Sequence, residues 1–442
     1  MTASTTRRST NLRHGGYRPP SALAAALFAA FALVVSFAPG AQSSPEVLVT
    51  TAPVWDFEFD SARNGTECPS CNFNNGDSRL AFIDNDRNLW LAWVDFQTGA
   101  FVPPDGKGQL IDVGAVPIAT FGNGPEWMSS ATYGSQIVYT KYPPGQEGRP
   151  AKATIAFATT MPNGAWTTAV LPNAVGRATP VGSLDENDTD PRVNYIKFDK
   201  TGLYWRKMSQ PGVENVIPVS DMTDGNARRW VPGTRKLIFH GTPRSTAVSD
   251  RAPLALAKAT QIFTYDTDTG ELEQLTNDPE GYVGAFMWNA PEYANELVFM
   301  TTPSGRQSVK VFRKVQGFDG IWRWKVVKTV AAPAASGLPF FWSPEPFVHN
   351  GRSYLVFQLS PDFKFYDKSV PTHVGISGIA RRDEPQVLTA GGPPRLRLDP
   401  EYFITAKGPL IYYKRSIPET ATSPPINDGV WYVDTKLGPP RP

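Results

Sequence analysis

Reactive side chains are scarce in this chain of 442 residues, which has only two cysteines and four histidines. No two histidines have the spacing of a zinc site. The serine-hydrolase motif Gly-x-Ser-x-Gly, the zinc-protease motif His-Glu-x-x-His and the phosphate-binding motif Gly-x-x-x-x-Gly-Lys are also missing. Serine hydrolases, zinc proteases and nucleotide hydrolases therefore lack support from any local motif. Sustained helical periodicity is missing too, so we expect little helix.

The first 44 residues have the composition of an export signal. Four arginines precede an apolar run at residues 22–38, and Pro39, Gly40 and Ala41 follow it. A basic lead, an apolar run and small residues behind it are typical of a cleaved signal. We therefore expect a secreted or periplasmic protein. The alternative is a retained membrane anchor, because the apolar run is close to spanning length.

An excess of charge of either sign is absent. The net charge is +2, and it becomes −2 when residues 1–44, which hold four arginines and no acid, are removed. A nearly neutral protein has no electrostatic footprint for nucleic acid or for anionic lipid. We expect a neutral or modestly charged partner, no nucleic acid, and no membrane contact beyond the export signal.

The two cysteines, Cys68 and Cys71, lie in a Cys-x-x-Cys arrangement. In an exported chain they are expected to form a small disulfide that acts as a local staple, because a short loop restrains the unfolded chain little. The alternative is a redox centre. That chemistry needs a helix N-terminus or a similar group to lower the thiol pKa, and an all-β chain offers no helix here.

Short segments of one design recur along residues 45–442. Each has a proline, usually a glutamate, an apolar stretch, a turn and a second apolar strand that ends in aromatics. The residues that follow the proline are Glu126, Arg192, Glu292, Glu345 and Glu401, and a degenerate copy lies near Arg229. Repeats of about 40–60 residues built from hairpins are the signature of a β-propeller. We predict one all-β domain at 45–442, a single propeller of about seven four-stranded antiparallel blades, with six or eight as alternatives.

The expected blades occupy residues 79–102, 126–171, 192–219, 229–275, 288–330, 341–388 and 401–433. Residues 46–59 include a strand with no blade of its own. We expect residues 46–50 to pair with residues 430–433, which would close the ring and remove an exposed sheet edge.

Two family resemblances follow from these segments. Residues 261–279, in which an Asp-rich turn with glycine separates two strands ending in Gln-Leu-Thr, resemble the repeat of TolB-like propellers. The openings at Ser343-Pro344-Glu345 and Asp399-Pro400-Glu401 resemble those of family-43-type glycoside hydrolases. The second resemblance implies an Asp base in an Asp-Pro opening, which matches Asp190 and Asp399, together with a glutamate acid.

If the openings are equivalent, their side chains surround one end of a central channel. Paired carboxylates there would suit glycosidic bond cleavage, in which one is protonated and the other is ionised. The candidate catalytic residues are Asp190, Asp399, Glu126 and Glu401. The candidate ligand-binding residues are Arg192, Glu292, Glu345, Trp127, Trp288, Trp342 and His240.

Each candidate has an alternative interpretation. A glutamate beside a strand-opening proline can accept backbone N–H bonds from the next blade, and tryptophans can pack between blades instead of stacking on sugars. A ring of carboxylates would also suit a hard cation such as calcium. His240, with Tyr195 or Tyr204, could serve a polysaccharide lyase. The acidic segments at 84–88 and 184–190 have the composition of turns and solvated loops.

The sequence therefore predicts an exported propeller that recognises a ligand, with carbohydrate or a cell-envelope component as the leading class, at one end of its channel. Glycoside cleavage is one form of this function. A TolB-like binding or scaffold protein without turnover is the alternative, and a polysaccharide lyase is a further one.

Overall fold

The structure is a computed structural model that describes residues 45–60, 76–115, 124–161, 164–198, 202–220, 228–243, 260–363 and 368–441. The expected signal at 1–44 and the expected Cys68–Cys71 disulfide lie outside the described residues. In the described part no helix is long and apolar enough to span a membrane.

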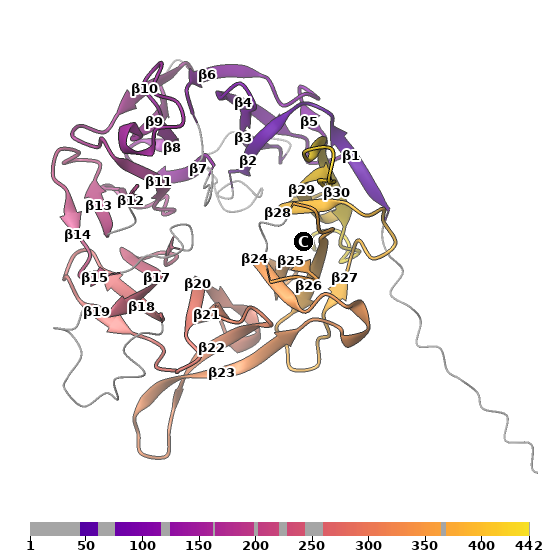
Figure 1. Ribbon diagram of the computed structural model, residues 1–442. Coiled ribbons are helices and arrows are strands. Elements are labelled where there is room, and N and C mark those ends of the chain that lie inside the picture. Colours follow the sequence, from indigo (N-terminus) through magenta and orange to yellow (C-terminus); the bar gives the residue numbers. More distant parts are fainter. Residues whose placement is uncertain are drawn as a thin grey trace, which may run out of the picture. The chain divides into compact units, whose positions relative to one another are not determined.

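Seven antiparallel sheets are arranged around a central channel, as the successive colours in Figure 1 show. Blade 1 orders its strands β2-β3-β4-β5, blade 2 β7 to β10 and blade 3 β11 to β14. Blades 5 and 6 contain β20 to β23 and β24 to β27. The predicted all-β propeller of seven blades is therefore confirmed.

The strands of the first three blades are β2 (Val54–Phe59), β3 (Ser78–Asp84), β4 (Asn88–Val94), β5 (Phe101–Val102), β6 (Gln109–Val113), β7 (Glu126–Ser130), β8 (Gly134–Lys141), β9 (Thr154–Thr160), β10 (Trp166–Val170), β11 (Arg177–Gly182), β12 (Arg192–Lys197), β13 (Leu203–Lys207) and β14 (Asn215–Val216). Strand β6 pairs with β4 beside β5.

The remaining strands are β15 (Val219–Ser220), β16 (Arg229–Trp230), β17 (Lys236–Pro243), β18 (Gln261–Asp266), β19 (Leu272–Gln274), β20 (Tyr282–Ala290), β21 (Glu296–Pro303), β22 (Ser308–Gln316), β23 (Trp322–Ala331), β24 (Phe340–His349), β25 (Arg352–Ser360), β26 (His373–Gly378), β27 (Gln386–Val387), β28 (Leu396–Thr405), β29 (Gly408–Ile417), β30 (Ile426–Asp434) and β1 (Glu46–Thr50). In blade 4 both β15 and β16 pair with β17. The helical segments of the described residues are the short 3-10 turns η2 (Pro150–Lys152), η4 (Pro291–Tyr293) and η5 (Ala334–Ser336).

The ring closes in blade 7 as the sequence predicts. Strand β1 pairs antiparallel with β30, with Glu46 opposite Val433, and so completes the order β1-β30-β29-β28. Figure 1 shows the indigo β1 beside the yellow β30. Inside this blade the Glu46 carboxylate accepts hydrogen bonds from Arg397 Nε and Nη2 at 2.7 and 2.8 Å. Gly392 lies so close to this carboxylate that a Cβ at position 392 would clash with Glu46 Oε2.

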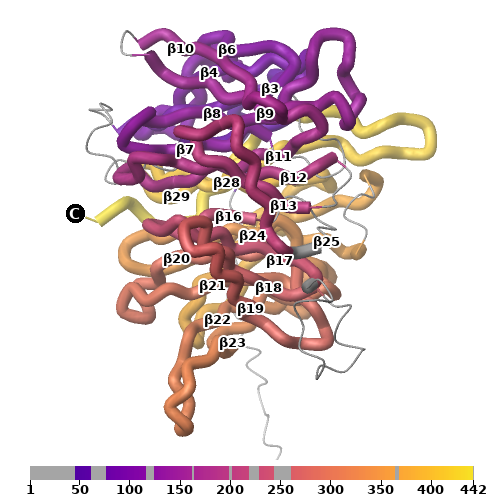
Figure 2. The backbone as a smooth tube through the Cα atoms, turned by 90° about the vertical axis from the view of Figure 1, so that its left-hand side faces the viewer, coloured from indigo at the N-terminus to yellow at the C-terminus, as the bar shows by residue number. Residues whose placement is uncertain are grey.

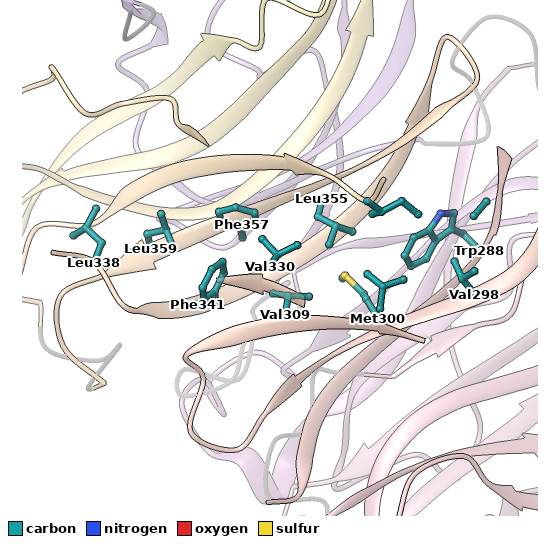
Figure 3. Packing of buried hydrophobic residues seen from close by; sticks show 13 residues of the cluster. Trp288, Val298, Met300, Val309, Val330, Leu338, Phe341, Leu355, Phe357 and Leu359 are labelled. Atoms are coloured by element: carbon teal, nitrogen blue, oxygen red, sulfur yellow. The ribbon is translucent and has the colours of Figure 1, made fainter. Parts of the chain in front are cut away.

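The hydrophobic core is divided into layers between neighbouring blades. Between blades 5 and 6, Trp288, Met300 and Val309 of one sheet pack against Phe341 and Phe357 of the next (Figure 3). Alternate residues of a strand face opposite sides of its sheet, so each blade contributes to two such layers. Blades of this kind bury apolar surface only against their neighbours, which makes the closure in blade 7 important for stability.

Four expected blade boundaries are wrong, among them that of blade 7, which begins at Leu396 and not at Glu401. Blade 1 begins with β2 and not at residue 79, and blade 5 begins at Tyr282 and not at Trp288. Blade 3 begins with β11, so Arg192 opens its second strand. In blades 3 and 5 a proline does not mark the innermost strand. Pro191 precedes the second strand of blade 3, and Pro291 starts a 3-10 turn. Figure 2 gives the side view of these strands.

Candidate functional site

Three of the innermost strands share one irregularity in the backbone. In β11, β24 and β28 the pairing register shifts around a residue that precedes a proline. This residue is Thr179, Ser343 or Asp399, and its φ is +51°, +41° or +58°. Left-handed backbone is unfavourable for these residue types and is concentrated at functional sites. Bulges re-aim side chains, so the bulges determine what each blade presents to the channel.

The residue after the proline differs between these blades. Blades 6 and 7 carry Glu345 and Glu401, whose carboxyl groups interact electrostatically with each other. Blade 3 carries Val181, which is buried between blades 3 and 4. Blade 2 begins with Gly124-Pro125-Glu126 and so presents a third glutamate at the start of β7.

Arg229 lies between these glutamates. Its Nη2 is 3.9 Å from Glu126 Oε1 and 3.6 Å from Glu345 Oε1. Since both oxygens lie this close to one nitrogen atom, the two carboxylates face each other across a single guanidinium group. That group stacks on Phe286 of blade 5 at 4.7 Å from the ring centre. Because both contacts to the glutamates are longer than a hydrogen bond, Arg229 acts on the two carboxylates through its charge.

A second cation is placed by blade 7. Lys414 of β29 donates to the carbonyl oxygen of Trp55 at 2.8 Å, and its Nζ lies 3.4 Å from Asp56 and 3.6 Å from Asp399. The two aspartates interact electrostatically with each other. Glu58, two residues after Asp56, interacts electrostatically with Glu126 and Glu345.

We call Asp56, Glu58, Glu126, Glu345, Asp399 and Glu401 the channel carboxylates. They come from blades 1, 2, 6 and 7, and the three cations that act on them are Arg228, Arg229 and Lys414. Six carboxyl groups facing three cations cannot all be ionised without strong repulsion, and burial adds to this cost.

The expected result is a set of raised pKa values. Burial is the largest cause and raises the pKa of Asp56 and of Glu345 to about 7, against the opposing effects of Lys414 and Arg229. Burial and the neighbouring Glu345 raise the pKa of Glu401 well above its ordinary value. Burial and its acidic neighbours therefore favour the protonated form of Glu401.

Glu58 and Glu126 respond differently. Burial, together with Glu126 and Glu345, raises the pKa of Glu58 well above its ordinary value. Burial also raises the pKa of Glu126, but Arg229 and Arg228 act against this rise. The group therefore contains one glutamate beside two guanidinium groups and another, Glu401, in an acidic neighbourhood. Two carboxyl groups whose surroundings push their pKa values apart are suited to act as acid and as base.

A cavity of about 350 Å³ lies next to these residues along the inner strands. Its walls are the loop at residues 184–187, the segment from Trp230 to Thr234, Ser129 and Tyr402. Trp230 and Tyr402 directly follow Arg229 and Glu401. The buried Ser129 hydroxyl has no hydrogen-bond partner among the described residues. This size lies within the range of pockets for small ligands.

The structure brings together four of the sequence candidates, Glu126, Glu345, Asp399 and Glu401. Asp190 and Arg192 do not join them. Arg192 is fully buried, and its Nη2 contacts Asp268 at 2.5 Å between blades 3 and 4. Glu292 lies in η4, beyond the end of β20, and accepts bonds from the Ser353 N–H at 2.5 Å and hydroxyl at 2.8 Å. Glu292 therefore links blades 5 and 6, as the alternative interpretation holds.

The aromatic candidates and His240 also lie between blades. Trp127 donates to the Glu58 carbonyl oxygen at 3.0 Å, Trp288 donates to the Ser353 hydroxyl at 3.0 Å, and Trp342 is 6% exposed beneath Arg306. His240 is fully buried and its Nδ1 accepts the Gly284 N–H at 3.1 Å. A base must reach its substrate, so the lyase interpretation loses its candidate base.

Sequence reasoning missed Asp56, Glu58 and Lys414, and it used Arg229 only to mark a repeat. The alternation Val54-Trp55-Asp56-Phe57-Glu58-Phe59, preceded by a proline, is the signal that could have identified an innermost strand. No signal identifies Lys414, because it lies on a second strand. No group of three His, Cys, Asp or Glu residues in the described part is arranged to hold a metal ion. The calcium suggestion therefore gains no support from these residues.

No family model matches this chain, and no curated protein matches it. Solved structures that it resembles include a candidate 6-phosphogluconolactonase of Bacteroides fragilis, with 14% identity over 79% of this chain and 95% of that chain and a TM-score of 0.41. TolB of Acinetobacter baumannii matches with 13% identity over 80% and 78% and a TM-score of 0.34. A fucose-recognising six-bladed lectin of the fungus Aleuria aurantia matches with 13% identity over 72% and 92% and a TM-score of 0.37. Such distant likenesses concern the fold alone, and the resemblance to family-43-type hydrolases stays a prediction.

Proposed function

We propose that the protein is an exported carbohydrate-active enzyme that cleaves glycosidic bonds in its central channel. The observation that carries this proposal is the convergence of three glutamates: Glu345 interacts electrostatically with Glu401, and Glu126 lies on the other side of the Arg229 nitrogen that Glu345 contacts. Glycoside cleavage needs one protonated and one ionised carboxyl group, separated by about 5–9.5 Å. Export rests on the composition of residues 1–44.

Each residue has a defined role in the proposed reaction. Glu401 supplies the proton, directly or through Glu345, to the glycosidic oxygen as the bond from carbon to oxygen breaks. Glu126, whose negative charge Arg229 stabilises, takes a proton from water or attacks the anomeric carbon. Asp399 and Lys414 bind sugar hydroxyls beside them. The distances of 3.9 Å from Arg229 to Glu126 and 3.6 Å from Arg229 to Glu345 place these two carboxylates close together, and the separation of Glu126 from Glu401 decides between inversion and retention.

The test is a screen of polysaccharides for released reducing ends, repeated with Glu401→Gln, Glu126→Gln and Asp399→Asn. Loss of turnover in the first two variants, with Asp399→Asn raising KM more than it lowers kcat, would support the proposal. Equal turnover in wild type and Glu401→Gln would refute it. The configuration of the released sugar, read by NMR, distinguishes inversion from retention.

A binding protein without turnover is the second candidate. The cavity beside the channel, with an aromatic ring on two walls, favours it because aromatic surfaces and a buried hydroxyl suit a single sugar unit. Glycan binding in a calorimeter without any released product, at every pH between 5 and 8, would establish this candidate over the enzyme.

A further inference from the structure

The hairpin of β22 and β23 projects beyond the ring of blades. Both views show it extending away from blade 5 (Figures 1 and 2). Its strands span nine and ten residues, and residues 317–321 connect them. Phe318 is fully exposed at the turn, and Ile321 and Trp322 are 54% and 57% exposed. Three large apolar side chains therefore share one protruding tip.

The side of the hairpin that faces blade 6 is basic. Lys328 Nζ donates to the carbonyl oxygens of Asp383 at 2.5 Å and Arg381 at 3.5 Å, so the loop that carries Arg381 and Arg382 lies against β23. Lys325, Arg381 and Arg382 are exposed and have no carboxylate within ion-pair distance among the described residues.

The other cations of the hairpin are already paired. Arg313 binds Glu296 and Lys314 contacts Glu273, while Arg323 at the tip binds Asp319. Among the described residues, Lys325 is thus the cation nearest the tip that has no ion pair. Arg381 and Arg382 lie at the level of Lys328, toward the base of the hairpin, and the exposed Glu384 follows them in the same loop.

We propose that this tip docks the protein onto an anionic lipid surface. Phe318, Ile321 and Trp322 would enter the boundary between headgroups and acyl chains, where amphipathic aromatic rings are favoured. Lys325 would face the negatively charged headgroups, and Arg381 and Arg382, farther from the tip, would add a longer-range attraction. A convex apolar tip can insert into a lipid layer because the lipids deform around it, whereas a protein partner would need a matching groove. Attachment there would hold the channel close to envelope glycans.

The test uses residues 45–442, which contain all seven blades and the closing strand and lack the apolar run at 22–38. Sedimentation is measured with vesicles of phosphatidylcholine alone and of phosphatidylcholine mixed equally with phosphatidylglycerol. We expect binding to the mixed vesicles that weakens with added salt. Phe318→Ser with Trp322→Ser should weaken it by at least about tenfold, since each ring loses its apolar burial. Lys325→Ser should weaken it by roughly fivefold.

Val175→Ser is the matched control, because Val175 is 62% exposed in the loop between blades 2 and 3. This variant should bind like wild type. The proposal is overturned if the mixed vesicles do not bind the protein, or if the tip variant binds as well as the control. It is also overturned if the tip substitutions abolish only concentration-dependent self-association, because the tip would then dock a second copy of the chain. Activity on soluble glycans tests the proposed function separately and should be unchanged in every variant.

Discussion

Blades 3 and 7 have closely similar frameworks but present different side chains to the channel. Each has a left-handed residue before a proline in its innermost strand, Thr179 in blade 3 and Asp399 in blade 7. Each also has an outer glutamate bound by two arginines and a tyrosine. In blade 3 these residues are Glu214, Arg177, Arg206 and Tyr195. In blade 7 they are Glu46, Arg397, Arg415 and Tyr413.

The two blades diverge at the residue after the proline. Blade 3 presents Val181, which packs between blades, and blade 7 presents Glu401, which joins the channel carboxylates. The blade repeat thus fixes where a side chain is placed, and a single substitution within the repeat fixes its chemistry. Chemistry gathers in blades 1, 2, 6 and 7, while blades 3 and 5 contribute apolar or aromatic surface.

The largest expected effect separates Glu401 from a glutamate that shares its sequence pattern. Glu401→Gln should lower kcat by about 10²–10⁴-fold because it removes the proposed proton donor and keeps the shape. Glu292→Gln, at the Ala-Pro-Glu opening of η4, should leave kcat unchanged and lower the melting temperature, because Glu292 links blades 5 and 6. Similar kcat values for both variants would contradict the distinction.

The two outer glutamates should differ in their effect on stability. Glu46→Ala should cost about 3–5 kcal/mol in the free energy of unfolding, because it leaves the buried Arg397 without its carboxylate at the ring closure, while Arg415 keeps Asp428. Glu214→Ala should cost about 1–3 kcal/mol, since its side chain is 22% exposed and Glu46 is 5% exposed. Urea unfolding measures both values. A larger cost at Glu214 would show that blade 7 is not the critical closure.

Arg229 should shift the pH dependence of activity. It lowers the pKa of Glu126 and of Glu345 relative to burial alone. Arg229→Met should therefore shift both limbs of the pH profile of activity to higher pH by roughly one pH unit. Arg229→Lys keeps the positive charge and should move them less. A profile that stays in place in Arg229→Met would exclude Arg229 from control of these carboxyl groups.

The channel carboxylates should also make the protein less stable as the pH rises. The raised pKa values of Asp56 and Glu345 mean that the folded state binds protons more tightly than the unfolded state. The free energy of unfolding should then fall as the pH increases from about 4.5 through 7. The melting temperature should drop by a few degrees between pH 5.5 and 8, and Glu345→Gln should reduce this drop. Glu46 has the opposite effect. Its pKa is lowered in the folded state, so the stability that it contributes is lost as the pH falls.

The smallest expected effect concerns backbone strain. Ser343→Gly should stabilise the protein by about 1 kcal/mol, because glycine adopts a φ of +41° without a Cβ clash. Ser308→Gly, at ordinary backbone in β22, should destabilise it by about 0.5–1 kcal/mol. A loss of stability in Ser343→Gly would show that the bulge of blade 6 is not strained.

The repeat made the fold and part of the site predictable. Proline followed by glutamate correctly placed Glu126, Glu345 and Glu401 on innermost strands, and the apolar residues 46–50 correctly predicted the closure. Glu292 and Arg192 were misplaced because proline opens several kinds of element. Lys414 and the pKa values could not be predicted, since both depend on which blades meet across the channel. Net charge likewise concealed the basic side of the β22–β23 hairpin, because charge segregates in space and not along the sequence.

The central claim is that the channel keeps carboxyl groups protonated at neutral pH. Infrared difference spectroscopy of the carboxyl C=O stretch at pH 7 tests it directly, with wild type compared to Glu401→Gln. We expect a band from protonated carboxyl groups in wild type that is diminished in the variant. A wild-type spectrum in which every carboxyl group is ionised at pH 7 would contradict the account.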